Sequence, residues 1–77
     1  MAGRPKKRSL TIAGHRTSIS LEDDFWAALH EVAEAKGRSV PQLIAEIDKA
    51  RGEHGLSSAI RSAVLAHFRT QSAVVKD

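Results

Sequence analysis

The sequence contains no cysteine in 77 residues, so it has neither a disulfide framework nor a thiolate metal site. Aromatic residues are also scarce: only Phe25, Trp26 and Phe68 occur, and none lies in the basic N-terminal part. This distribution argues against recognition of single strands or RNA by base stacking. No apolar run approaches the ~20 residues that span a bilayer, and no signal-peptide pattern follows the start. We therefore expect a cytoplasmic protein with no membrane partner.

The length of 77 residues predicts one domain. A chain of this size buries little apolar surface by itself, and small domains often depend on disulfides, a metal or a partner for stability. Because disulfides are excluded, we expect a second copy of the chain to supply that support.

Charge is distributed unevenly along the chain. Residues 1–20 carry five basic residues and no acidic one, whereas residues 21–77 carry seven basic and nine acidic residues. Such a block of charge indicates a polyanionic partner, most often nucleic acid. Residues 1–8 show no apolar periodicity, which predicts a disordered basic arm. Its segment "GRPKKR" resembles an AT-hook core, and its cations are Arg4, Lys6, Lys7 and Arg8.

Hydrophobic periodicity divides the rest into one strand and three helices. The strand is expected at about 16–21 and the helices at about 22–36, 40–51 and 57–69, in a domain covering residues 9–70, with a frayed tail at 71–77. Residues 9–12 also alternate, and Ala13 to His15 separate them from the strand. This pattern fits a hairpin, and it equally fits a glycine-marked bend in one extended arm. We find no internal repeat.

The strand has two faces, because successive side chains point to opposite sides. Thr17, Ile19 and Leu21 share one face, and a polar set shares the other. A strand of about six residues is not stable alone in water. Its expected partner is the same strand of a second copy, which gives a two-fold dimer.

The helices carry apolar stripes that continue the inner face of the strand. "KG" at 36–37 ends the first helix, and Ser39 with Pro41 begins the second. The residues expected in a dimer core are Ile19, Leu21, Phe25, Leu29, Val32, Val40, Leu43, Ile44 and Ile47.

The segment "RTSISLEDDFWAALHEVAEAKGRSVPQLIAEI", and above all its "KGRSV" turn, resembles the ribbon-helix-helix family of DNA-binding proteins. The wider run "SLTIAGHRTSISLEDDFW", with "LSSAIRSAVLAHFR", resembles a subgroup of short bacterial members with an additional C-terminal helix. The resemblance implies a mostly α fold, formed as an intertwined homodimer with an antiparallel two-stranded ribbon. It also implies a transcriptional regulator of the repressor type, whose dimers in some cases associate further on DNA.

The polar face of such a ribbon is the part that enters the DNA major groove. Arg16 is the best candidate for a bidentate contact to guanine, and Ser18 and Ser20 read bases less strictly. The start of the second helix is an expected phosphate site, where Arg38, Ser39 and Val40 offer donors beside the positive end of the helix dipole.

Chemistry other than DNA binding finds little support in the sequence. The four histidines lack metal-ligand spacing, and no nucleophile–base pair or glycine-rich phosphate loop occurs, so we expect no enzyme, no metal and no cofactor. Two rival functions are an antitoxin that represses its own operon and a dimeric protein–protein adaptor that does not bind DNA. In the main interpretation the third helix is expected to cover the dimer core, to extend the dimer interface or to present a surface to another protein.

Overall fold

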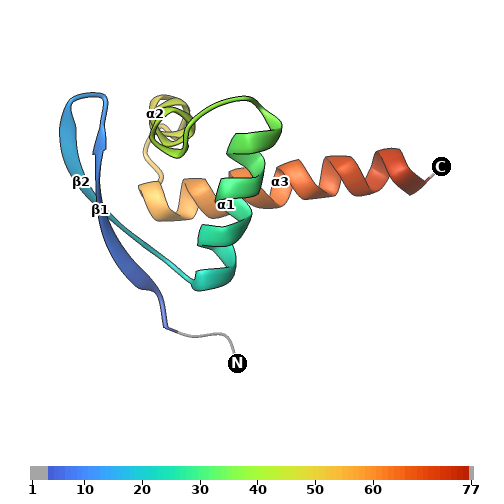
Figure 1. The fold of residues 1–77 in the computed structure, drawn as a ribbon, viewed down its shortest axis with the longest axis horizontal. Helices are drawn as coiled ribbons and strands as arrows, with labels where there is room; N and C mark the ends of the chain where they lie inside the picture. Colours follow the sequence, from blue (N-terminus) through green and yellow to red (C-terminus); the bar gives the residue numbers. More distant parts are fainter. Residues whose placement is uncertain (1–3, 77) are drawn as a thin grey trace.

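The computed structural model describes residues 4–76, with the backbone alone after Gln71. Within these residues two strands come first, β1 (Lys6–Ile12) and β2 (His15–Leu21). Three helices follow: α1 (Asp23–Ala35), α2 (Val40–Ala50) and α3 (Leu56–Lys76). The strands form a hairpin on one side of the helices, and the C-terminal part of α3 extends away from it (Figure 1).

A two-residue turn joins the strands. Ala13 and Gly14 have φ values of 51° and 85°, and positive φ at both central residues matches the right-handed twist of a tight hairpin. The strands are antiparallel, in a register that runs from Ile12 opposite His15 to Lys6 opposite Leu21. The seven residues of β1 therefore pair along the whole length of β2.

Helix α1 begins directly after β2 and ends where the sequence predicts. Asp23 and Asp24 lie in its first turn, where their negative charge complements the helix dipole. Gly37 follows the helix with a φ of 67°, and the Arg38 amide donates to the Ala33 carbonyl at 2.9 Å. This left-handed glycine closes the helix and turns the chain into α2.

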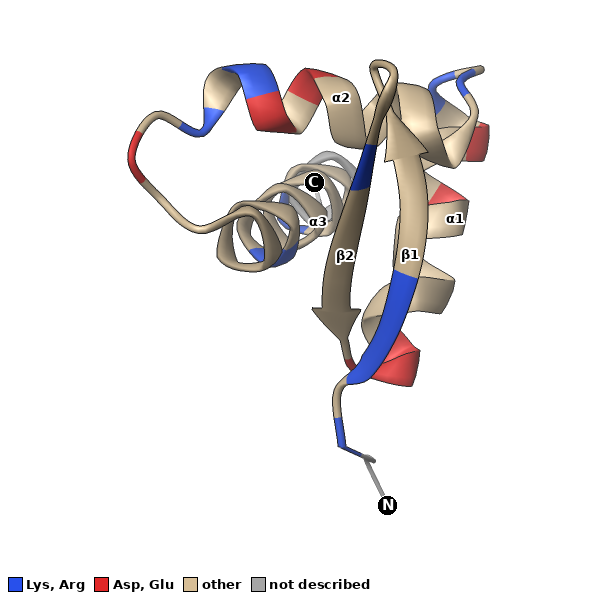
Figure 2. Cartoon of the chain, turned by 90° about the vertical axis from the view of Figure 1, so that its left-hand side faces the viewer, with Lys and Arg blue, Asp and Glu red and all other residues tan. Residues whose placement is uncertain are grey.

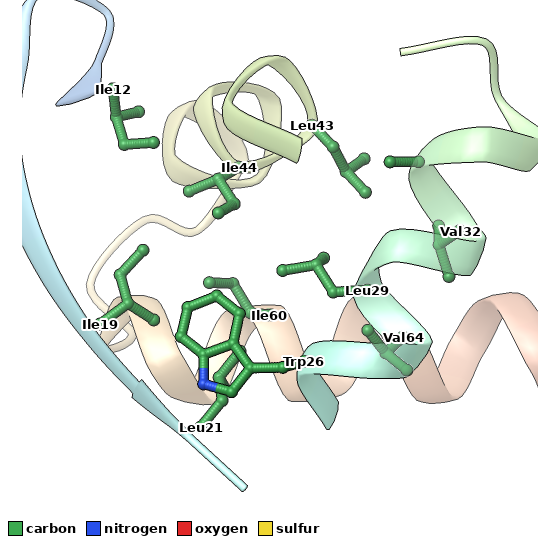
Figure 3. Close-up of a cluster of buried hydrophobic side chains, with 11 residues drawn as sticks. Ile12, Ile19, Leu21, Trp26, Leu29, Val32, Leu43, Ile44, Ile60 and Val64 are labelled. Atoms are coloured by element: carbon green, nitrogen blue, oxygen red, sulfur yellow. The ribbon is translucent and has the colours of Figure 1, made fainter. Parts of the chain in front are cut away.

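One apolar core joins all five elements. Among the residues described, it contains no buried polar side chain. Figure 3 shows side chains of the hairpin and of all three helices pointing toward one another. The buried residues are Ile12, Ile19, Leu21, Trp26, Leu29, Val32, Ala33, Leu43, Ile44, Ile60 and Val64. The inner face of the hairpin thus packs on the helices of its own chain.

The expected fold class is confirmed: the chain is mostly helical, with a two-stranded antiparallel ribbon and a third helix. The strand predicted at about 16–21 is β2, and of the two alternatives for residues 9–15 the structure adopts the hairpin. The partner of β2 is β1 of the same chain, where we expected a strand from a second copy. The turn and the apolar inner side of β1 explain this difference, because Leu10 and Ile12 pack on the shared core.

Two boundaries need correction. Lys6 to Arg8 belong to β1, so the expected disordered arm of residues 1–8 does not hold at those positions, while residues 1–3 lie outside the described part. Helix α3 continues to Lys76, past the expected end near Arg69. Residues 70–76 contain no glycine or proline that would stop it. The predicted frayed tail is therefore helical as far as Lys76.

The turn provides a test of the hairpin. Alanine at positive φ costs roughly 1 kcal/mol, whereas asparagine adopts this conformation more readily. We expect Ala13→Asn to raise the free energy of unfolding by about 0.5–1 kcal/mol. Urea unfolding followed by the fluorescence of the single tryptophan, Trp26, measures the change.

Ala27, exposed on α1, provides the matched control. Ala27→Asn should lower the free energy of unfolding by up to about 0.7 kcal/mol, because asparagine is a poorer helix former than alanine. Equal destabilisation by both substitutions would contradict the turn at Ala13.

Candidate nucleic-acid interface

The outward face of the hairpin, here called the outer face, is made of six hydrogen-bonding side chains. They form three cross-strand pairs, and all are exposed except Ser20, which is half-buried. The pairs are Lys7 with Ser20, Ser9 with Ser18, and Thr11 with Arg16. The outer face is therefore polar along its whole length.

The charge of this surface is entirely positive. The strands contain no acidic residue, and the outer face carries the cations Lys7 and Arg16. Figure 2 looks onto the hairpin and shows basic residues on both strands, with the acidic residues on the helices and loops around it. An anion approaching the hairpin from this side meets positive charge and donor groups first.

The three residues predicted to contact bases lie where the sequence analysis placed them. Arg16, Ser18 and Ser20 point outward together from β2. The other half of the surface comes from Lys7, Ser9 and Thr11 of β1, which were not predicted from the sequence. A signal was present, because "KRSLT" at 7–11 matches "RTSIS" at 16–20 in its order of basic, serine and hydroxyl residues.

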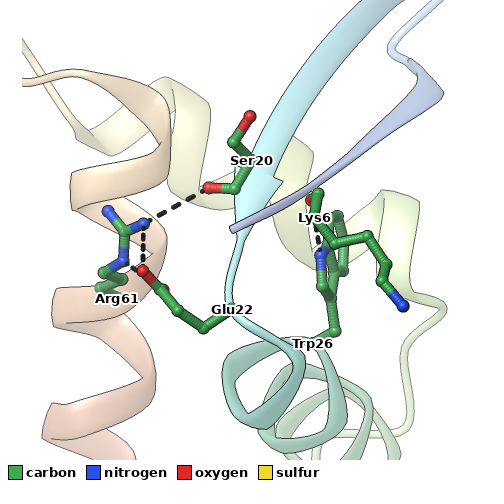
Figure 4. A network of polar contacts seen from close by, with 5 residues as sticks. All are labelled: Lys6, Ser20, Glu22, Trp26 and Arg61. Atoms are coloured by element: carbon green, nitrogen blue, oxygen red, sulfur yellow. Dashed lines mark hydrogen bonds and ion pairs between the residues drawn. The ribbon is translucent and has the colours of Figure 1, made fainter. Parts of the chain in front are cut away.

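Two cations of the predicted arm hold β1 against α1. The Arg8 guanidinium lies over the Trp26 ring, 5.1 Å from its centroid, and the Lys6 ammonium lies 3.4 Å from the Asp23 carboxylate. The Lys6–Asp23 pair is exposed and so adds little stability. The Trp26 indole N–H donates to the Lys6 carbonyl at 3.0 Å (Figure 4). Of the cations in β1, only Lys7 is left on the outer face.

Helix α3 fixes the other side of the ribbon through Arg61. Its guanidinium donates to both carboxylate oxygens of Glu22, at 3.0 and 3.3 Å, and to the Ser20 carbonyl at 3.4 Å (Figure 4). The same group lies 5.9 Å from the centroid of the Phe25 ring. Arg61 therefore ties the end of β2 and the start of α1 to α3. Hydrogen bonds from Arg61 are the main cause that holds the pKa of Glu22 below its ordinary value of 4.5.

The predicted phosphate site at the start of α2 is partly occupied by its own capping box. The Ser39 hydroxyl accepts from the Gln42 amide at 3.2 Å, and the Gln42 side chain accepts from the Ser39 amide at 2.9 Å. Arg38 forms an ion pair with Glu46 at 2.7 Å. Of the groups predicted to donate hydrogen bonds to a bound anion, the Val40 amide and the Ser39 hydroxyl proton take no part in the contacts just described.

The residues predicted for a dimer core lie in the core of the single chain. Six are buried, and Phe25, Val40 and Ile47 are partly buried against them. An apolar groove of about 580 Å³ opens between the three helices. Helices α1 and α2 contribute Leu29, Val32, Leu43 and Ile47 to its lining, all from the predicted set.

Within residues 4–76, no cluster of three or more histidine, aspartate or glutamate side chains is placed to hold a metal ion. None of the helices described is both long and apolar enough to cross a membrane.

A family model described as a ribbon-helix-helix domain matches residues 5–68, which span both strands, α1, α2 and α3 as far as Phe68. No curated protein and no solved structure matches the chain.

The Arg61–Glu22 contact predicts how stability depends on pH. A carboxyl whose pKa is lowered by folding contributes stability above its ordinary value, and this contribution is lost as the pH falls through the lowered pKa. As the pH is lowered below 4.5, the wild type should lose more free energy of unfolding than Glu22→Gln does. Urea unfolding at a series of pH values measures this difference.

Glu34→Gln is the control, since it removes an exposed carboxylate of α1 that forms no ion pair among the residues described. It should keep the acid profile of the wild type. An unchanged profile in Glu22→Gln would contradict the role of the Arg61 contact.

Proposed function

Because the chain belongs to the ribbon-helix-helix family, a family of DNA-binding regulators, we propose that it binds double-stranded DNA sequence-specifically by inserting the outer face of its hairpin into the major groove. The observation that carries this proposal is the outer face itself: six hydrogen-bonding side chains, two of them cationic, on strands that contain no acidic residue. A two-stranded ribbon fits the width of the major groove, where each base pair displays a distinct pattern of donors and acceptors.

Arg16 is the residue best suited to select a base. Its exposed guanidinium presents a planar fork of donors that matches the O6 and N7 atoms of guanine. Ser18 and Ser20 add hydroxyl groups that donate or accept, and they discriminate less between bases. The bond from Arg61 uses the main-chain carbonyl of Ser20, so the Ser20 hydroxyl remains available to DNA.

Contacts to the DNA backbone complete the proposed interface. The Val40 amide and the Ser39 hydroxyl lie at the start of α2, where the helix dipole favours a phosphate. Arg38 and the basic N-terminal residues, Arg4 among them, add attraction that does not depend on sequence and weakens with salt. Such contacts position the ribbon without selecting a sequence.

A homodimer is the proposed assembly. The groove between the helices exposes Ala50 and Ala66 and leaves Ile47 and Ala63 half-buried, and a second copy of the chain would cover these apolar side chains. Two copies on neighbouring DNA elements bind more tightly than one, which suits a repressor that occupies a promoter. We further propose that the protein is bacterial and cytoplasmic and that it regulates transcription.

A dimeric protein–protein adaptor is the second candidate. It is favoured by the same groove and by Leu65 on α3, which is 56% exposed although it is a large apolar residue.

Arg16→Ala tests the proposed reading of bases. Loss of a bidentate contact is worth ~1–3 kcal/mol, which corresponds to about 5-fold to 150-fold weaker binding to a selected site. Binding to unrelated DNA should weaken less, because there the substitution removes a positive charge but no base contact. Fluorescence anisotropy at fixed salt with both duplexes gives the two affinities.

Arg69→Ala is the matched control, because Arg69 is exposed in the C-terminal half of α3. The C-terminal part of this helix extends away from the hairpin (Figure 1). The control substitution removes the same charge and should leave the preference for the selected site unchanged. If Arg16→Ala lost the same factor of affinity on both duplexes, Arg16 would not read a base.

Ala66→Glu tests the homodimer. Ala66 is exposed and lines the groove, so a carboxylate there would lie unpaired in the dimer interface while the chain still folds. We expect the dissociation constant of the dimer to rise by about tenfold or more in sedimentation equilibrium. Ala27→Glu, on an exposed part of α1 outside the groove lining, should not change it. A wild type that stays monomeric at high concentration would contradict the proposed homodimer.

A further inference from the structure

The two strands of the hairpin carry the same short pattern. "KRSLT" at residues 7–11 and "RTSIS" at residues 16–20 both read basic, any residue, serine, apolar, hydroxyl. The spacing between equivalent positions is nine residues throughout, so the chain, in which we expected no internal repeat, carries a short repeat of five residues on either side of the turn.

Because of the pairing register, this repeat makes the hairpin nearly two-fold symmetric. Ser9 and Ser18 are opposite each other, with their hydroxyl oxygens 3.5 Å apart. A two-fold axis through this pair, perpendicular to the ribbon, exchanges the strands and places Lys7 on Arg16. Because Lys7 and Arg16 lie on opposite sides of this pair in the register, the two cations of the outer face occupy diagonal corners.

The side of the hairpin that faces the helices has the same two-fold relation. The axis places Leu10 on Ile19 and Ile12 on Leu21, and all four side chains pack on or in the core. The equivalence therefore extends to the side of the ribbon that faces the helices. A single chain therefore forms a nearly symmetric ribbon of the kind that two identical strands would form in a symmetric dimer.

Both sides of β2 are also engaged within the chain. One side pairs with β1 along seven residues, and on the other the Ser20 carbonyl accepts a hydrogen bond from Arg61 of α3. Helix α3 thus closes the end of β2 at which another strand would add.

We infer that a single chain presents the complete DNA-reading ribbon, in which Lys7 is the counterpart of Arg16. This inference rests on the proposed function. Lysine and arginine both donate to guanine O6 and N7, so the two residues contact two-fold related positions of one short, near-palindromic element. Arginine binds guanine through a rigid fork and lysine through a single ammonium group, so the preference is stronger on the Arg16 side.

Selection of bound sequences from random duplex DNA tests this arrangement with four proteins: the wild type, Arg16→Ala, Lys7→Ala and Lys49→Ala. The wild type should enrich a near-palindromic element. Arg16→Ala should relax the preference at one of its two related positions and Lys7→Ala at the other. Lys49→Ala loses the same charge at an exposed position of α2 and should change neither.

A ribbon made of β2 strands from two chains gives a different result. Arg16→Ala would then relax both related positions together and Lys7→Ala would relax neither, which overturns the inference and leaves the proposed function standing. Absence of any enriched sequence with the wild type would overturn the proposed function itself, and the inference with it.

A second measurement uses the absence of cysteine from the chain. The double variant Ser9→Cys/Ser18→Cys should form a disulfide within one chain, because directly opposed residues of antiparallel strands lie within disulfide reach. On a non-reducing gel its oxidised form should run as a single chain. A disulfide formed only between chains would overturn the inference.

Discussion

The ribbon depends on the tight turn at Ala13 and Gly14. Positive φ at both residues reverses the chain within two positions, so β1 returns along β2 in a register that matches their apolar and polar alternation. The apolar side chains of β1 then complete the core of the same chain, and its polar side chains double the width of the outer face. A shift of the pairing register by one residue would turn every side chain of β1 to the wrong side.

The helices hold this ribbon from two directions. Trp26 of α1 binds the main chain of β1 and lies under the Arg8 guanidinium, while Arg61 of α3 binds the junction between β2 and α1. The third helix therefore has a role in the chain itself, because it fixes the angle at which the ribbon leaves the helices. The proposed DNA surface and the groove between the helices are then separate, since no residue of either strand lines the groove.

Local patterns in the sequence predicted most of the helices and strands, because hydrophobic periodicity and helix caps depend on residues within a few positions of one another. The alternation of residues 16–21 identified the outward set Arg16, Ser18 and Ser20, and "KGRSV" located the turn before α2. The pairing of β1 was not predictable in the same way, since an Ala-Gly turn is a weaker hairpin signal than Asn-Gly. The cations at 6–8 indicated a disordered arm, whereas their order comes from contacts with residues about 20 positions away, such as Trp26. The capping box that occupies Ser39 and Gln42 was visible in the sequence as serine followed three residues later by glutamine.

Nuclear Overhauser effects between the α-protons of Ser9 and Ser18 show directly whether the ribbon forms within one chain. These residues are opposite each other, and the measurement can distinguish contacts within a chain from contacts between chains. In a mixture of isotope-labelled and unlabelled protein, an isotope-filtered spectrum records only the contacts between chains. For a ribbon within one chain we expect a strong Ser9–Ser18 signal in the fully labelled sample and none in the filtered spectrum of the mixture. A filtered signal between these protons, or between two Ser18 residues, would contradict it.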